Sequence, residues 1–202
     1  MILLHGFGSN MHDLAAMAPH IDDKNYIYAC PNAPLNVDLG LGRRGFAWAS
    51  IGTPVSKNEY LNSQDILLSF IEELTDSLGT PKNQVILGGF SQGAMMTYRL
   101  GIPRPKYFAG LVALGGLLEA EFVPVNKTFV AKEQPIFIAH GTLDTVIPIE
   151  SARTAKSRLE QVGFRPTYKE YPISHAINHD ILSDLSSWLS ILFSNMHSQE
   201  SI

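Results

Sequence analysis

Hydrophobic residues in this chain form short continuous runs that alternate with longer stretches in which apolar residues recur every three or four positions. Short runs that end near glycine or proline are typical of buried strands, and longer periodic stretches are typical of helices with one apolar face. The predicted strands are residues 2–4, 26–30, 85–87, 109–114, 135–139 and 167–171. The predicted helices are residues 11–21, 56–78, 92–100, 148–162 and 177–192. Apolar strands separated by helices predict an α/β architecture, a mostly parallel sheet with helices on both faces.

One predicted strand-to-helix junction carries a serine between two glycines. Gly89-Phe90-Ser91-Gln92-Gly93 has the G-x-S-x-G pattern. A turn this tight strains the serine backbone, and a side chain in place of either glycine would collide with the neighbouring chain. The turn would hold the Ser91 hydroxyl at the carboxyl edge of the sheet, beside a helix N-terminus that favours negative charge. The motif therefore predicts a nucleophile, with a simple glycine-rich turn as the alternative.

Two later loops carry an acid and a histidine. Asp144 lies in the loop after the fifth predicted strand, and His175 lies in the loop after the sixth. Both loops leave the same sheet edge as Ser91, so the three side chains can meet as nucleophile, base and orienting acid. A helix N-cap is the alternative role for Asp144, and His179 is the alternative base. Two other loop-end histidines are expected to hold loop backbone rather than transfer protons: His5 and His140.

Acyl transfer also requires hydrogen-bond donors for the oxyanion of a tetrahedral intermediate. The N–H of Gln92, directly after the serine, is one expected donor, and the second should come from Phe7 or Gly8 in the glycine-rich loop after the first strand.

Two long stretches without a clear period, residues 35–55 and 117–133, are expected to wall the substrate cavity. The helix after the first stretch should begin at a capping box formed by Ser56 and Glu59. The candidate lining residues, each with ordinary core packing as the alternative, are Phe46, Trp48, Leu117, Leu118, Phe122 and Ile147.

Three motifs in the correct order carry a family resemblance. They are Leu4-His5-Gly6-Phe7-Gly8, Gly89-Phe90-Ser91-Gln92-Gly93-Ala94, and His140-Gly141-Thr142-Leu143-Asp144 with Val146 and Pro148. Together they resemble the phospholipase/carboxylesterase family of α/β-hydrolases, which includes the acyl-protein thioesterases, and the similarity covers nearly the whole chain. The resemblance implies an α/β-hydrolase fold and hydrolysis of carboxylic esters through an acyl-enzyme, with acyl thioesters as an open alternative. The implied roles are Ser91 as nucleophile, His175 as general base, Asp144 as its partner, and the Phe7 and Gln92 amides as the oxyanion hole.

The chain departs from the family pattern in two places. Ser174 stands where the family usually has a glycine before the histidine. Relatives also begin with an additional pair of strands, so either the start lies upstream of Met1 or the sheet is shortened. In a shortened sheet, residues 27–30 would form an exposed edge open to pairing with a second copy, and a homodimer is one expectation.

Composition limits the partners. The chain has 202 residues, enough for the one domain expected over residues 1–202. Its formal net charge of −4, without a run of lysine or arginine, argues against nucleic acid as a partner.

No apolar run approaches the length of a membrane span, and residues 1–6 lack the features of a signal peptide. With a single cysteine, Cys30, these features favour the cytoplasm. The mechanism requires no metal or organic cofactor.

Three other functions are weighed against an esterase. A peptidase or lipase is the weaker alternative, because the chain leaves little room for a large cap domain or lid. An enzyme similar to dienelactone hydrolases would share the fold and the order of the three residues, but it would usually carry cysteine at the position of Ser91. A ligand-binding protein on the same scaffold would have an unactivated serine, so labelling by a fluorophosphonate separates it from an enzyme.

Overall fold

A five-stranded parallel sheet forms the centre of the structure, a computed structural model that describes residues 1–52, 57–125 and 133–199. The strand order is β1-β4-β5-β6-β7, and each pairing between these neighbours is parallel. The strands are β1 (Ile2–Leu4), β4 (Ile86–Phe90), β5 (Gly110–Leu114), β6 (Ile136–Gly141) and β7 (Thr167–Tyr171). The first four are buried almost throughout, which explains their continuous apolar sequences. The predicted α/β arrangement is confirmed.

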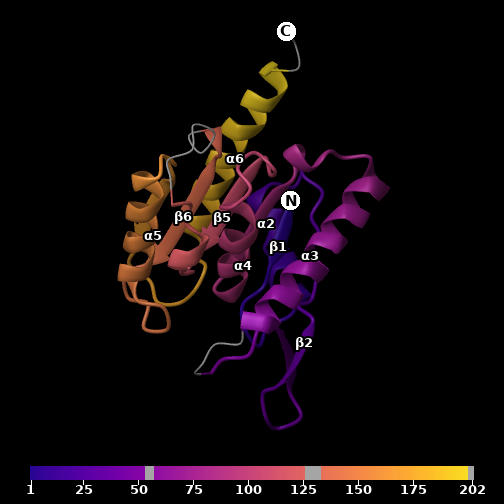
Figure 1. The fold of residues 1–202 in the computed structure, drawn as a ribbon, viewed down its shortest axis with the longest axis vertical. Coiled ribbons are helices and arrows are strands. Elements are labelled where there is room, and N and C mark those ends of the chain that lie inside the picture. Colours follow the sequence, from indigo (N-terminus) through magenta and orange to yellow (C-terminus); the bar gives the residue numbers. More distant parts are fainter. Residues whose placement is uncertain (53–56, 126–132, 200–202) are drawn as a thin grey trace.

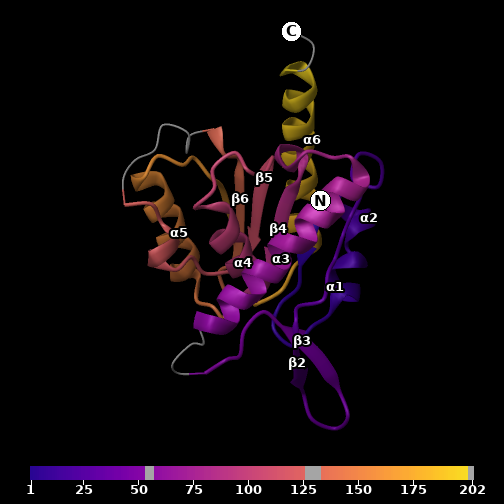
Figure 2. The same cartoon turned by 45° about the vertical axis from the view of Figure 1, so that its right-hand side comes forward.

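Helices cover both faces of the sheet (Figures 1 and 2). One face packs against α3 (Lys57–Leu78), α4 (Gln92–Gly101) and α5 (Ile149–Gln161). The other face packs against α1 (Met11–Ala15), α2 (Ala18–Ile21) and α6 (His179–Gln199). Successive side chains of a strand point to opposite faces, so Ile2 and Leu4 join the first core and Leu3 joins the second. Two apolar layers therefore hold the sheet in place.

A β-hairpin lies within the stretch 35–55 that was expected to be irregular. Strands β2 (Leu35–Asp38) and β3 (Arg44–Ala47) pair antiparallel, and the hairpin extends away from the central sheet (Figure 2). Its base is hydrogen-bonded to the loop after β1, since Gly8 N donates to Phe46 O at 2.9 Å and Phe46 N donates to Ser9 O at 2.8 Å. A Cβ at Gly45 would overlap the Gly8 carbonyl. Gly45, which this approach requires, interrupts the strand pattern of β3 in the sequence.

Two further expectations about elements need correction. Residues 26–30 do not form a strand, because this segment contacts β1 through a single parallel bridge between Ala29 and Ile2. Residues 11–21 form two short helices, with Pro19 in the first turn of α2, where its missing N–H leaves no hydrogen bond unmade.

Other boundaries agree with the structure to within a few residues. Helix α3 is described from Lys57, so the capping box expected at Ser56 lies outside the described residues. The stretch 117–133 contains one short 3₁₀ turn, Ala120–Phe122, and its residues 126–132 also lie outside the described part. Among the described helices, none is both long enough and apolar enough to cross a bilayer.

Candidate active site

Ser91 occupies the junction between β4 and α4 in a strained backbone conformation, with φ 55° and ψ −117°. Two glycines make this turn possible. A Cβ at Gly89 would overlap the backbone of Gly93, and a Cβ at Gly93 would overlap the Leu4 carbonyl of β1. The collisions expected from the sequence are therefore present on both sides of the serine. Such strain persists only where the surrounding structure enforces it, and it is common at active sites.

The three predicted residues form one hydrogen-bonded chain. His175 Nε2 lies 2.8 Å from Ser91 Oγ, and His175 Nδ1 lies 2.6 Å from Asp144 Oδ2. Each residue comes from the loop after a different strand: β4, β6 and β7. The His175 ring also packs against the Phe90 ring, with 4.8 Å between centroids. Because a carboxylate can only accept, Nδ1 carries a hydrogen and Nε2 is free to accept the Ser91 proton.

Asp144 is buried and receives hydrogen bonds on both carboxylate oxygens. Oδ1 accepts from the amides of Val146 and Ile147 at 2.9 and 2.8 Å, while Oδ2 accepts from His175 and lies 3.3 Å from His140 Nε2. Burial by itself would raise the pKa of Asp144, but the hydrogen bonds from His175 and the two amides outweigh it and hold the pKa below its ordinary value. The carboxylate therefore stays charged and fixed beside the imidazole.

His140 and His5 bind backbone, as the sequence predicted. His140 Nε2 lies 2.7 Å from the Ile147 carbonyl, so it carries the hydrogen. His5 Nε2 accepts from the Ala33 amide at 3.0 Å, and its Nδ1 lies 2.7 Å from the Gly6 carbonyl. Burial lowers the pKa of His5, so this imidazole is neutral. The alternative base His179 is the exposed first residue of α6, and it is not part of the chain from Ser91 to Asp144.

Two backbone amides are available for an oxyanion. Within the described part of the chain, neither the Phe7 amide nor the Gln92 amide donates to a protein acceptor. The sequence left Phe7 and Gly8 as alternative donors. The Gly8 amide already donates to the Phe46 carbonyl, so of these two only the Phe7 amide is available. This loop lies against Ser91, since a Cβ at Gly6 would be 3.3 Å from Ser91 Cβ.

The Gln92 side chain has a role that the sequence did not reveal. Its Oε1 accepts from the Trp48 amide at 2.8 Å, and its Nε2 donates to the Ala49 carbonyl at 2.7 Å. The segment after β3 is thereby fixed to the residue that follows Ser91. The sequence shows that a glutamine follows Ser91, but it does not show that this side chain binds backbone 43 and 44 positions away.

A cavity of about 1000 Å³ opens over Ser91 and His175. Of the six residues expected to line it, Leu117 and Ile147 do so, and the other four need correction. Trp48 and Leu118 are fully buried, and Trp48 Nε1 donates to the His5 carbonyl at 2.9 Å. Phe46 packs on the core, and Phe122 packs on the Arg99 guanidinium at 4.6 Å. Residue type alone does not tell an aromatic in the core from one on a cavity wall.

Other segments of the wall were not expected. Helix α1 and its link to α2 contribute His12, Asp13, Leu14, Ala16 and Met17. The opposite side contributes Ser50, Ile51, Gly52, Tyr60, Met95 and Glu119. The cavity therefore extends over both faces of the sheet edge, with the predicted nucleophile between the two parts.

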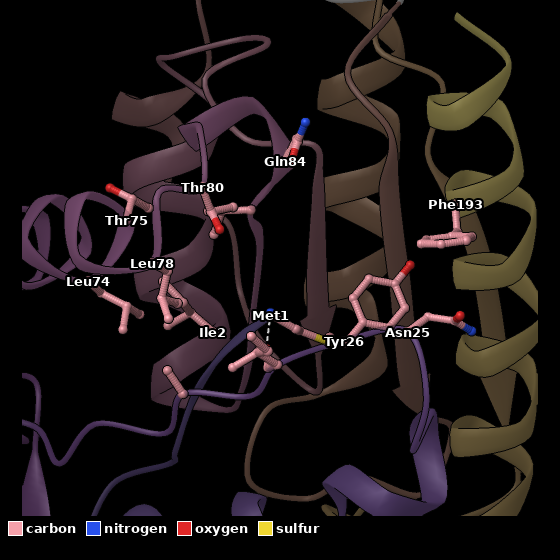
Figure 3. A pocket seen from close by; sticks show the side chains of 13 residues that line it. Met1, Ile2, Asn25, Tyr26, Leu74, Thr75, Leu78, Thr80, Gln84 and Phe193 are labelled. Carbon is pink, nitrogen blue, oxygen red and sulfur yellow. Dashed lines mark hydrogen bonds between the residues drawn. The ribbon is translucent and has the colours of Figure 1, made fainter. Parts of the chain in front are cut away.

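A second cavity, of about 300 Å³, is shown with its lining side chains in Figure 3. Its lining includes Met1 and Val85, which precede β1 and β4, together with Leu74 and Leu78 of α3 and Phe193 of α6. Ligands of open α/β sheets collect at the carboxyl ends of the strands, whereas this cavity lies at the amino ends. None of the predicted site residues lines it.

The phospholipase/carboxylesterase family model matches residues 1–193. The chain belongs to this family. Being a member of the phospholipase/carboxylesterase family, it is an enzyme of the serine-hydrolase class. No group of three His, Cys, Asp or Glu side chains that could hold a metal ion occurs among the residues described.

Individual relatives agree with the family assignment. The chain is 33% identical over 164 residues to acyl-protein thioesterase 1 of Schizosaccharomyces pombe, covering 77% of this chain and 73% of the relative. It is 27% identical over 206 residues to acyl-protein thioesterase 1 of Yarrowia lipolytica, covering 94% and 89%. A crystal structure of a carboxylesterase from Mesorhizobium loti superposes with a TM-score of 0.80 at 19% identity, covering 94% of this chain and 87% of that chain. The last similarity shows the α/β-hydrolase fold that the sequence predicted.

Proposed function

We propose that this protein hydrolyses carboxylic esters, and acyl thioesters as a second substrate class, through a covalent acyl-enzyme on Ser91. The observation that supports the proposal most strongly is the continuous chain from Ser91 Oγ through His175 to Asp144, with hydrogen bonds of 2.8 and 2.6 Å. Family members named acyl-protein thioesterase 1 support the inclusion of thioesters.

In the first step, Ser91 Oγ attacks the substrate carbonyl carbon while His175 Nε2 takes the hydroxyl proton. The carbonyl oxygen becomes an oxyanion beside the Phe7 and Gln92 amides, and each such donor typically contributes about 3 kcal/mol to lowering the barrier. The tetrahedral intermediate collapses as His175 gives its proton to the departing alcohol or thiol. Asp144 stabilises the imidazolium while that proton resides on the ring.

In the second step, a water molecule loses a proton to His175 and attacks the acyl carbon. Collapse of the second intermediate returns the proton to Ser91 Oγ and releases the carboxylic acid. The chain's own groups account for each proton, and no cofactor is needed for either step.

Replacement of Ser91 by alanine tests the assignment. We expect kcat for a short-chain ester to fall by about four orders of magnitude or more, with loss of labelling by a fluorophosphonate. Ser187→Ala, an exposed hydroxyl on α6, is the matched control and should retain the full rate. A Ser91→Ala enzyme with the wild-type rate would overturn the proposal. An unlabelled wild-type protein without esterase activity would favour a ligand-binding role.

Three further expectations from the sequence stay proposals. Residues 1–202 are proposed to form one domain, located in the cytoplasm and able to form a homodimer. Limited proteolysis, cell fractionation and sedimentation, respectively, measure these properties.

A further inference from the structure

The cavity over Ser91 is lined by two carboxylates and by no lysine or arginine among the residues that the structure describes. Asp13 lies on the side formed by the first helices, and Glu119 lies on the side formed by α3 and α4. An ester bound with its carbonyl at Ser91 must send its acyl group and its leaving group in different directions from that serine. The acyl group and the leaving group would thus lie in different parts of the cavity. One of these parts contains Asp13 and the other contains Glu119.

The Glu119 carboxylate faces the cavity because its cationic partner lies behind it. Arg99 Nη2 is 2.5 Å from Glu119 Oε1, but the Arg99 side chain is only 3% exposed and that of Glu119 is 24% exposed. The guanidinium is also held between two aromatic rings, 3.8 Å from the Tyr60 centroid and 4.6 Å from the Phe122 centroid. This packing fixes the ion pair with its negative end toward the substrate.

On the opposite side, Asp13 forms no ion pair with a lysine or arginine among the described residues. Asp13 accepts a hydrogen bond from the Ser9 hydroxyl, a neutral donor next to the oxyanion loop. Burial raises the pKa of Tyr60 and lowers that of His5, so these two lining groups are uncharged at neutral pH. The remaining titratable lining groups are the imidazoles of His12 and His175.

We propose that this cavity selects esters by charge, and that Glu119 is a specificity-determining residue. Building on the esterase function proposed above, substrates with uncharged or cationic groups on either side of the ester react, and substrates with an anionic group react poorly. A fixed carboxylate a few ångströms from a substrate charge, in a partly desolvated cavity, changes kcat/KM by about 10-fold in either direction. We expect kcat/KM for an anionic ester to lie about 10- to 100-fold below that for its cationic isostere.

Two matched ester series test the proposal on the 202-residue chain. One series varies the alcohol at constant butyrate: choline, its uncharged isostere neohexyl alcohol, and hydroxypropionate. The other series places trimethylammonium, tert-butyl or carboxylate at the end of the acyl chain of a nitrophenyl ester. The anionic member should be the slowest in both series, and equal rates for the anionic and uncharged members would overturn charge selection.

Variants then locate the effect. Glu119→Gln should raise the anionic-to-uncharged ratio of kcat/KM about 10-fold in at least one series. Glu121→Gln removes the same formal charge two residues away, at an exposed side chain that pairs with Lys57 outside the cavity, and it should leave the ratio unchanged. If both variants alter the ratio equally, the net charge of the chain is responsible and Glu119 is not specificity-determining.

Glu119→Gln leaves the buried Arg99 guanidinium without its charged partner and could fail to fold. Asp13→Asn, at an exposed position on the opposite side, provides the second variant and should raise the same ratio in the other series. No change in either series for Asp13→Asn would restrict selection to one side of the cavity and would contradict the two-sided form of the proposal. The two proposals can fail separately. If the wild-type protein hydrolyses the uncharged esters and Ser91→Ala does not, the esterase function stands, whatever the outcome for charge selection.

Discussion

Two histidines contact the same oxygen of Asp144, and their surroundings differ. His175 Nδ1 lies 2.6 Å from Asp144 Oδ2, its other nitrogen faces Ser91, and its side chain is 16% exposed at the cavity. His140 Nε2 lies 3.3 Å from that oxygen, and its side chain is not exposed at all. Its other nitrogen, Nδ1, has no hydrogen-bond partner within the described structure.

The difference favours His175 over His140 as the base in the mechanism proposed above. A base must reach both the nucleophile and the substrate, and it must carry charge during the reaction. His175 can do so, because Asp144 stabilises the imidazolium directly. His140 makes no hydrogen bond to Ser91 among the described residues, and its Nδ1 is buried without a partner. His140 instead donates to the Ile147 carbonyl and holds the turn whose amides bind Asp144.

The largest expected effect comes from replacing the exposed member of this pair. His175→Gln should lower kcat by about four orders of magnitude or more, because the amide cannot accept and return the serine proton. Steady-state kinetics on a neutral ester measures the change. His179→Gln, four residues later and exposed at the start of α6, is the control and should retain the wild-type rate. Loss of activity in the control instead would assign the base to His179.

The sequence was sufficient to predict the parts of the site that depend on local backbone geometry. Glycine is required at positions 89 and 93 because a side chain there would collide with the backbone of the same tight turn or of β1. The five-residue motif around Ser91 is therefore enough to predict the turn. The parallel sheet was equally readable, since each interior strand is apolar on both faces. The loops after these strands had to meet at one edge, which brought Asp144 and His175 together.

The cavity walls could not be predicted because they depend on distant contacts. Trp48 is an aromatic in a glycine-rich stretch, a pattern compatible with either a wall or the core. Its place in the core follows from two hydrogen bonds, one from the Trp48 amide to the Gln92 side chain and one from the Trp48 ring to the His5 carbonyl. Neither partner is near Trp48 in the sequence. Asp13 and Glu119 lie on separate segments, and nothing local indicates that they share one cavity. The pairing of β2 with β3 was similarly hidden, because Leu35–Asp38 alternates apolar and polar residues over only four positions and a glycine interrupts Arg44–Ala47.

A smaller effect is expected from the buried member of the pair. His140→Leu should lower kcat by about 10- to 100-fold with little change in KM, because the turn that orients Asp144 loses a hydrogen bond and the carboxylate shifts. His140→Gln keeps an N–H donor and should recover most of the rate. The low-field proton resonance of His175 Nδ1–H, measured by NMR, should weaken in the leucine variant and return in the glutamine variant. An unchanged resonance in His140→Leu would show that His140 does not position Asp144.

The smallest expected effect concerns stability and its dependence on pH. Asp144→Asn should lower the free energy of unfolding by about 1 to 3 kcal/mol at neutral pH. The amides of Val146 and Ile147 donate to Oδ1 and His175 donates to Oδ2, whereas asparagine keeps one neutral acceptor oxygen and an NH2 group that cannot accept from the donors on its side. The folded-state pKa of Asp144 is held below its ordinary value, so this stabilisation is fully present above the unfolded pKa of about 3.9 and is lost as the pH falls through the folded pKa. Urea unfolding of both proteins between about pH 7 and pH 3 should show the two curves converging only at the acidic end. Asp65→Asn, an exposed carboxylate on α3, is the matched control, and its difference from wild type should stay within about 0.5 kcal/mol at every pH. If the difference between wild type and Asp144→Asn instead stays constant down to the lowest pH, the charge of this carboxylate does not stabilise the fold. The ionisation of Asp144 would then matter only to the reaction.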